Sequence, residues 1–160
     1  MLRRLTVRNY AIIKELDLEF GEGFTIITGE TGAGKSILLG ALGLVLGERA
    51  DTSVLLSQDE KCIVEACFNI SGYDLDELFE ANEIDYDDEA ILRREIAPSG
   101  KSRAFLNDTP VNLNVLKELG GRLIDVHSQH ETLLLGSGYF QMRVADAYAG
   151  TSGLAKEYSG

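Results

Sequence analysis

The sequence predicts an α/β fold in which a mixed β-sheet surrounds one apolar helix. Residues 24–28 form a short, mostly apolar and β-branched run, which is typical of a buried strand. A glycine-rich loop follows from residue 29, and residues 37–46 are long and apolar enough for a buried helix. Residues 62–70 alternate apolar and polar side chains, as a strand with one buried face does. Strands that alternate with helices in this way define the α/β class.

The other segments predict further elements separated by turn residues. Gly40 and Gly43 lower the helix propensity of the apolar helix but permit close packing against it. The further strands are expected at residues 5–7, 16–20, 91–96, 102–106 and 123–126. The further helices are expected at residues 74–81, at 113–119, where Gly120 and Gly121 would end the helix, and at 142–148.

Length and composition are those of a globular domain. The chain has 160 residues, of which 44% are hydrophobic and 26% charged, enough to build a core. No run reaches the roughly 18 apolar residues of a membrane span, so we expect no membrane partner. The two cysteines are too few for a disulfide scaffold. These features predict a cytoplasmic protein.

The formal net charge of -11 is concentrated in one segment. Residues 74–89 contain nine acidic residues and no lysine or arginine, which we interpret as a solvated face or a docking surface. Basic residues follow in the predicted hairpin of residues 91–106. This hairpin is a candidate contact to DNA or to another lobe, and a merely solvated hairpin is the alternative. Its basic residues are Arg93, Arg94, Lys101 and Arg103.

One motif predicts a nucleotide-binding loop. Residues 29–36 match the pattern G-x-x-x-x-G-K-[ST], and they lie between the predicted strand and the apolar helix, as this loop requires. Its glycines let backbone amides converge on phosphate, and the helix N-terminus adds positive charge. Lys35 would reach the β- and γ-phosphates and Ser36 would ligate Mg²⁺. The predicted ATP-binding residues are Gly29, Glu30, Thr31, Gly32, Ala33, Gly34, Lys35 and Ser36.

The groups needed for turnover are incomplete in the sequence. No run of four apolar residues precedes an Asp-Glu pair, and no Leu-Ser-Gly-Gly-Glu signature is present. Gln129 lies in a polar loop after a predicted strand, where it could touch both Mg²⁺ and the attacking water; an exposed loop glutamine is the alternative. We therefore expect this chain to bind ATP and Mg²⁺ without significant turnover by itself.

Several stretches together resemble the RecN family, bacterial DNA repair ATPases related to SMC proteins. The most specific of them is Asp-Val-His-Ser-Gln-His-Glu at residues 125–131, which resembles the Asp-Ile-His-Gly-Gln-His-Glu block of the family with serine in place of glycine. The other matching stretches are residues 5–13, 16–20, 29–36, 46–51, 92–94 and 100–107. The resemblance covers roughly residues 1–150.

The resemblance implies an ABC/SMC-type ATPase head that a long coiled coil divides into two lobes. Residues 1–150 would be the N-terminal lobe, and residues 151–160 would lead toward the coiled coil. The C-terminal lobe would supply the missing signature and Walker B residues, and two heads would sandwich ATP in a homodimer. Gln129 would be the Q-loop glutamine, and Arg49 would reach nucleotide or the partner head. The implied activity is DNA-stimulated ATP hydrolysis in recombinational double-strand break repair at the nucleoid.

Two other classes share the nucleotide-binding loop. A membrane-transporter ATPase subunit should have a shorter interval between Lys35 and Gln129 and an intact signature in the same domain. A small P-loop kinase should carry arginine-rich lid residues that clamp two substrates, and Arg93, Arg94 and Arg103 have no evident lid around them. A nucleotide-sensing module without catalysis would look much like this chain taken alone.

Overall fold

The computed structural model describes residues 1–28, 32–50, 52–126 and 138–149, which fall into two compact units, residues 1–124 and 125–160. The strands of the first unit are β1 (Leu2–Tyr10), β2 (Ile13–Glu19), β3 (Cys62–Asn69), β4 (Glu89–Ile96), β5 (Ser102–Leu106) and β6 (Thr109–Val111). Its helices are α1 (Gly32–Val45), the 3-10 turn η1 (Thr52–Val54), α2 (Asp76–Ala81) and α3 (Leu113–Leu123). The second unit contains α4 (Gly138–Ala149).

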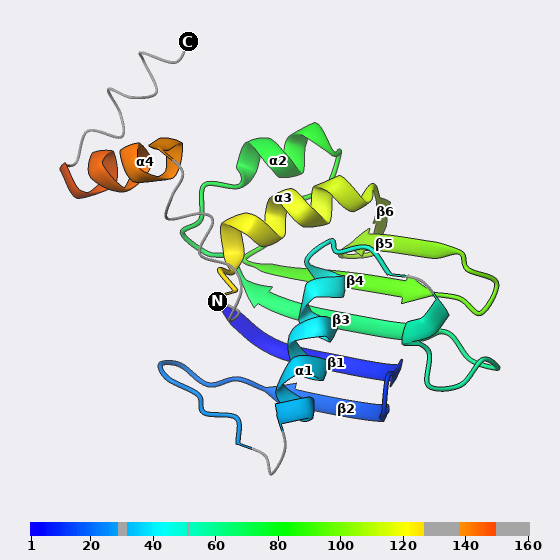
Figure 1. The fold of residues 1–160 in the computed structure, drawn as a ribbon. Coiled ribbons are helices and arrows are strands. Elements are labelled where there is room, and N and C mark those ends of the chain that lie inside the picture. Colours follow the sequence, from blue (N-terminus) through cyan, green and yellow to red (C-terminus); the bar gives the residue numbers. More distant parts are fainter. Residues whose placement is uncertain (29–31, 51, 127–137, 150–160) are drawn as a thin grey trace. The chain divides into compact units, whose positions relative to one another are not determined.

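The six strands form one sheet in the order β2-β1-β3-β4-β5-β6 (Figure 1). Each neighbouring pair is antiparallel. The predicted mixed sheet is therefore wrong for the strands that the structure describes. A parallel pair needs a strand that enters after a crossover, and the segment expected to be that strand, residues 24–28, forms no strand here.

One face of the sheet carries the hydrophobic core. Leu5, Ala66, Leu92 and Leu106 lie opposite one another on successive strands, and all four are buried. Helix α1 packs across β1, β3 and β4, and α3 packs on β5, so both helices cover this face (Figure 1). The alternation predicted for residues 62–70 is confirmed, because every second side chain from Cys62 is fully buried.

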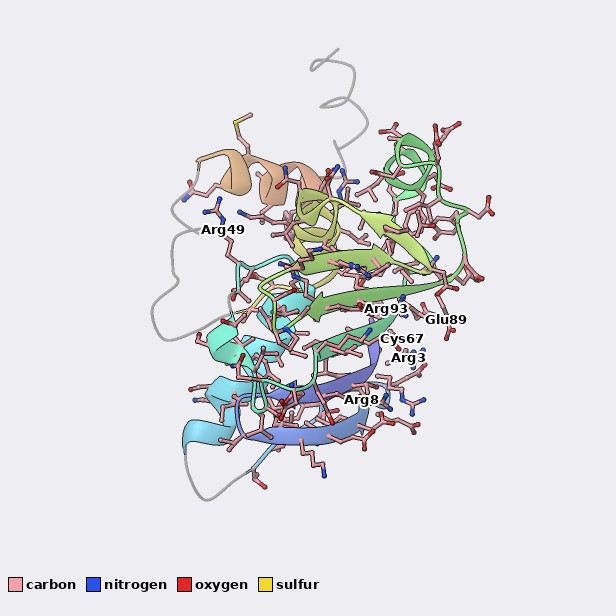
Figure 2. All side chains as sticks on the ribbon, turned by 90° about the vertical axis from the view of Figure 1, so that its right-hand side faces the viewer. Arg3, Arg8, Arg49, Cys67, Glu89 and Arg93 are labelled. Atoms are coloured by element: carbon pink, nitrogen blue, oxygen red, sulfur yellow. The ribbon has the colours of Figure 1, made fainter. Side chains whose placement is uncertain are left out.

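The opposite face of the sheet carries charged side chains that pair across strands. Arg4 donates from Nε to Oδ1 of Asp17 at 2.7 Å, and Arg8 lies 3.0 Å from Glu15. This pairing lowers the pKa of the Asp17 carboxyl below its usual value. Figure 2 shows Arg8 together with Cys67 and Arg93 on the side of the sheet away from α1. The charges of this face are thus largely compensated by one another.

Glycines let α1 pack closely, as the sequence indicates. A Cβ on Gly40 would come within 2.5 Å of the Tyr10 hydroxyl, and one on Gly43 within 2.5 Å of the Glu48 carboxylate. After α1 the chain turns through Gly47 at φ +95°, where a Cβ would lie 2.7 Å from the backbone nitrogen of Lys117 in α3. The end of α1 is therefore in backbone contact with α3.

Buried Asn9 holds the segment that follows η1. Its φ of 52° is a left-handed conformation that asparagine tolerates better than most residues. Its side-chain amide donates to the carbonyl oxygens of Ser57 and Glu60 at 2.9 and 2.8 Å, and its Oδ1 accepts from the Ser57 amide at 2.7 Å. These bonds satisfy both polar ends of the buried side chain.

Three sequence expectations about elements are wrong. Residues 24–28 are not a buried strand: Phe24 is 89% exposed and Ile26 is 70% exposed. Helix α3 does not end at Gly120 and Gly121 but continues to Leu123, because Gly120 packs against Leu46 and Leu123 is buried. The strand expected at residues 123–126 is consequently absent, and the short strand β6 was not foreseen.

The other expected elements are present with shifted ends. The strands expected at residues 5–7, 16–20, 91–96 and 102–106 are β1, β2, β4 and β5, and the helices expected at 37–46, 74–81 and 142–148 are α1, α2 and α4. All nine acidic side chains of residues 74–89 are exposed, as a solvated face requires. Helix α2 buries Leu78 and Phe79 beneath them. No helix in the described parts of the chain is long and apolar enough to cross a membrane.

Candidate functional site

The predicted nucleotide-binding loop leads into the N-terminus of α1. Gly29, Glu30 and Thr31 lie outside the described residues, and the helix begins at Gly32. Helix α1 has 14 residues and no acidic side chain in its first turn. The N-terminus of such a helix carries partial positive charge and amides without intrahelical partners, which favours an anion. The structure thus places the described end of the loop, from Gly32 to Ser36, at the start of a helix, as the motif requires.

The described end of the loop is exposed and lies beside open space. Gly34, Lys35 and Ser36 are all exposed on the first turn of α1. A Cβ on Gly34 would meet no heavy atom within 4 Å, so the space beside its backbone is open. Lys35 can therefore supply a cation and Ser36 a hydroxyl ligand for Mg²⁺ beside that space. Gly32 and Ala33 contribute helical backbone to the same turn.

Of the other predicted nucleotide contacts, Arg49 is described, and it is not brought to this end of α1. Gln129 lies outside the described residues. Arg49 is exposed in the loop after α1 (Figure 2), and α1 rises about 15 Å between Lys35 and Val45 at the usual helical pitch. Arg49 therefore lies at the opposite end of the helix from Lys35.

The four basic residues of the predicted hairpin do not form one surface. Arg93 and Arg94 are neighbours on β4, so their side chains leave the sheet on opposite faces. Arg93 lies on the charged face, 3.9 Å from each of Glu65 and Glu95, and its guanidinium carbon is 4.5 Å from the centroid of the Phe105 ring. Arg94 lies on the helix-covered face and is 5% exposed. The four residues predicted as contacts to DNA or another lobe therefore do not share one face, and Arg94 is buried.

Lys101 and Arg103 remain exposed at the far end of the hairpin. Lys101 lies in the turn before β5, and Arg103 lies opposite Glu95 in the ladder between β4 and β5. The alternation of strand side chains could have separated Arg93 from Arg94 in the sequence. Leu92, Arg94 and Ile96 share the period of the buried positions, but the sequence interpretation treated all four basic residues as one group.

The comparisons with known proteins agree with this geometry. A family model described as an AAA domain matches residues 4–82. The DNA repair protein RecN of Vibrio cholerae is 46% identical over 98% of this chain, which corresponds to 28% of that relative's length. The RecN of Bacillus subtilis is 38% identical over 94% of the chain and 26% of its own length. The chain therefore spans about a quarter of the length of these relatives.

Solved structures share the fold at lower sequence identity. A chain from a study of ATP-driven dimerization and DNA-stimulated activation of SMC ATPases has a TM-score of 0.61, with 21% identity over 89% of this chain and 95% of that one. The SMC head domain from Thermotoga maritima has a TM-score of 0.55, with 22% identity over 74% of this chain and 41% of that one. The recombination mediator RecF, in its RecF-ATPrS structure, has a TM-score of 0.56, with 21% identity over 72% of this chain and 29% of that one.

The fold, with its glycine-rich loop at the start of α1, is that of a P-loop ATPase of the SMC head class. Over the region that it spans, the chain belongs to the RecN family of DNA repair proteins. The resemblance inferred from the sequence motifs is thereby confirmed.

Proposed function

We propose that this chain is the ATP-binding lobe of a RecN-type ATPase head acting in recombinational double-strand break repair. The observation that carries the proposal is the exposed Gly34-Lys35-Ser36 turn at the N-terminus of α1. Residues 29–36 hold the phosphates, Lys35 balances the charge on the β- and γ-phosphates, and Ser36 ligates Mg²⁺. Gln129 completes the magnesium and water contacts, and Arg49 reaches toward the second head of a homodimer.

The second lobe of the head covers the apolar segment before the loop. Phe24, Ile26 and Ile27 are 89%, 70% and 58% exposed, although they directly precede the nucleotide-binding loop. An exposed group of large apolar side chains marks an interaction site. The relatives are almost four times as long as the matched region, which leaves ample chain for a C-terminal lobe. That lobe would supply the signature and Walker B residues, so turnover requires both lobes.

We expect this chain alone to release phosphate from ATP at a rate indistinguishable from that of its Lys35→Ala variant. Phosphoryl transfer to water needs a carboxylate and a water-positioning group that are incomplete here. Adding the remaining part of the protein as a separate chain should produce an ATPase activity that depends on Lys35. The measurement is steady-state phosphate release with and without that part. Robust release by the chain alone, lost in Lys35→Ala, would contradict the division of roles between the lobes.

We propose that any DNA contact of the hairpin is made by Lys101 and Arg103. Arg94 is buried and Arg93 is engaged by two carboxylates, whereas Lys101 and Arg103 are exposed. The double variant Lys101→Ala/Arg103→Ala should weaken DNA binding and lower the slope of log K against log salt by about 2, since each lost phosphate contact lowers it by about 0.9. The matched control, Arg4→Ala/Arg8→Ala, removes two ion-paired arginines. Equal slopes for the double variant and the unchanged chain would exclude the DNA contact.

A further inference from the structure

Arg94 is a charged residue in an otherwise apolar row of side chains on the helix-covered face. The ladder pairings align it with Leu16, Val7 and Val64 on one side and with Ala104 and Val111 on the other. Every other member of this row across the sheet is apolar. An arginine at such a position removes a permanent charge from water, which costs stability unless a partner compensates it.

No partner for Arg94 is present in the part of the chain that the structure describes. The side chain makes neither a hydrogen bond nor an ion pair there, and its Nε is fully buried without an acceptor. Burial also lowers the pKa of Arg94 below the usual arginine value. The Nε of its neighbour Arg93 is likewise buried without a hydrogen-bond acceptor, but the Arg93 guanidinium lies 3.9 Å from each of Glu65 and Glu95. What distinguishes Arg94 on the helix-covered face is that no carboxylate of the described residues lies beside it.

Arg94 lines a pocket of about 610 Å³ between the β4–β6 edge of the sheet and the start of α3. Ala104, next to Arg94 in the ladder, carries only a methyl group and so leaves space beside the guanidinium. Ser102 lies on the same face of β5 as Ala104, two residues before it. Asn112 and Leu113 bring the N-terminus of α3 to the pocket, and the Asn112 side chain does not cap that helix.

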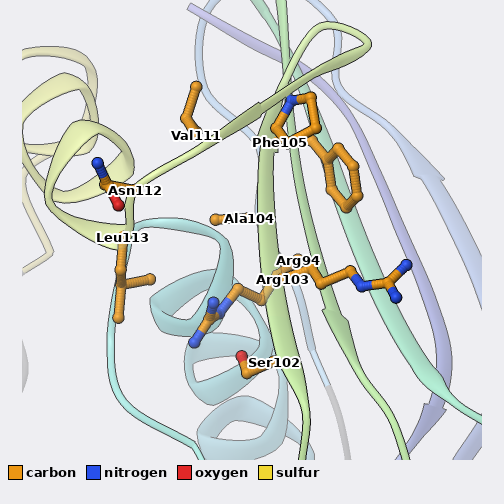
Figure 3. Close-up of a pocket in the computed structure, with 9 residues that line it drawn as sticks. Arg94, Ser102, Arg103, Ala104, Phe105, Val111, Asn112 and Leu113 are labelled. Atoms are coloured by element: carbon orange, nitrogen blue, oxygen red, sulfur yellow. The ribbon is translucent and has the colours of Figure 1, made fainter.

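Arg103 also lines the pocket, but its side chain leaves the sheet on the opposite face from that of Arg94 (Figure 3). Arg103 lies on the face of β5 opposite to Ala104, together with Phe105. Figure 3 shows the two arginine side chains leaving the strands in opposite directions. Only one arginine therefore faces the space beside Ala104, with the Ser102 hydroxyl and the positive end of the 11-residue helix α3 nearby.

We propose that this pocket is a carboxylate-binding site in which Arg94 is the recognising cation, and that its occupant is an aspartate or glutamate side chain of a protein segment. One guanidinium matches one monovalent carboxylate in charge and in its two-pronged geometry. A phosphate with two negative charges would leave charge uncompensated in a buried site. Ala104, Val111 and Leu113 provide apolar surface for the methylene groups of such a side chain.

The test uses as its probe a single capped glutamate residue, the N-acetyl, N-methylamide derivative. The corresponding glutamine derivative is the uncharged control. The readout is the Nε–H resonance of Arg94 in a proton–nitrogen correlation spectrum, assigned by its loss in Arg94→Met. We expect the glutamate derivative to shift this resonance in a saturable way, acetate to do so more weakly, and the glutamine derivative and chloride of equal ionic strength to leave it unchanged. Inorganic phosphate should bind at least about tenfold more weakly than the glutamate derivative.

Variants separate recognition from folding. Arg94→Met should fold with a melting temperature no lower than that of the unchanged chain, because it removes an unpaired buried charge, and should lose the thermal stabilisation by the glutamate derivative. Arg103→Met, on the opposite face, should retain that stabilisation. Ser102 is exposed, so Ser102→Ala should weaken the thermal stabilisation by the glutamate derivative while leaving the fold intact. This variant provides the test if Arg94→Met does not fold.

Three outcomes would overturn the proposal. If the Nε–H resonance of Arg94 does not shift when the glutamate derivative is added, the pocket binds no carboxylate. Tighter binding of phosphate would assign the pocket to phosphate-bearing ligands. A lower melting temperature of Arg94→Met without any ligand, together with unchanged binding in Ser102→Ala, would make Arg94 a structural residue.

Discussion

Replacing Lys35 by alanine is expected to weaken ATP–Mg²⁺ binding by roughly 10- to 100-fold, the equivalent of losing about one hydrogen bond to a charged group. Lys35 is exposed on the first turn of α1, beside the open space at Gly34. Backbone amides and the helix dipole remain in the variant, but the point charge over the outer phosphates is lost. Titration calorimetry with ATP and Mg²⁺ measures the effect directly.

A matched lysine provides the control for this experiment. Lys14 is exposed on β2, so Lys14→Ala removes the same charge from the same unit without touching the loop. Its affinity for ATP–Mg²⁺ should equal that of the unchanged chain within about twofold, because exposed charges at a distance are screened. Equal affinities of Lys35→Ala and Lys14→Ala would refute ATP binding by this loop.

Replacing Gly47 by alanine is expected to destabilise the first unit by about 2–5 kcal/mol. The left-handed backbone costs an alanine about 1–2 kcal/mol, and forcing a methyl group into a packed contact adds about 1–3 kcal/mol. At φ +95° the Gly47 amide donates to the Leu44 carbonyl and the next amide, of Glu48, donates to Gly43, so the glycine closes the end of α1. Its added Cβ would lie 2.7 Å from a backbone atom of α3, which cannot move without displacing the helix.

Chemical denaturation followed by circular dichroism gives the change in unfolding free energy of Gly47→Ala. Gly72→Ala is the matched control, because Gly72 also has a positive φ, of +81°, but its Cβ would meet nothing within 4 Å. The Gly72→Ala variant should therefore lose only the cost of the left-handed backbone, about 1–2 kcal/mol of unfolding free energy. A loss in Gly47→Ala no greater than in Gly72→Ala would show that contact with α3 is not what requires glycine there.

Local sequence patterns were sufficient for most of the sheet and for the start of α1. The alternation from Cys62 to Ile70 reports burial on one face, and that face is buried as expected. The spacing of Gly34, Lys35 and Ser36 demands the start of a helix, and α1 supplies it. These features depend on neighbours along the chain, so a sequence contains them directly.

Predictions failed where a distant segment decides the structure. The apolar run of residues 24–28 has the composition of a buried strand, but the described residues offer it no strand to pair with. Gly120 and Gly121 have the composition of a helix end, but packing of Gly120 against Leu46 continues α3 past them. Helix and strand propensities are worth less than the burial that tertiary contacts provide.

The sequence by itself determined the class of this protein, a P-loop lobe of the RecN family, by its motifs, and it predicts the ligand contacts from the chemistry of residues 29–36. Tertiary structure decided which of the charges are buried and which are paired. Arg93 and Arg94 are adjacent in the chain, yet one is paired on the charged face and the other is buried without a partner on the helix-covered face. The reason is that a strand sends successive side chains to opposite faces, and only the packing of α1 and α3 decides which face excludes water.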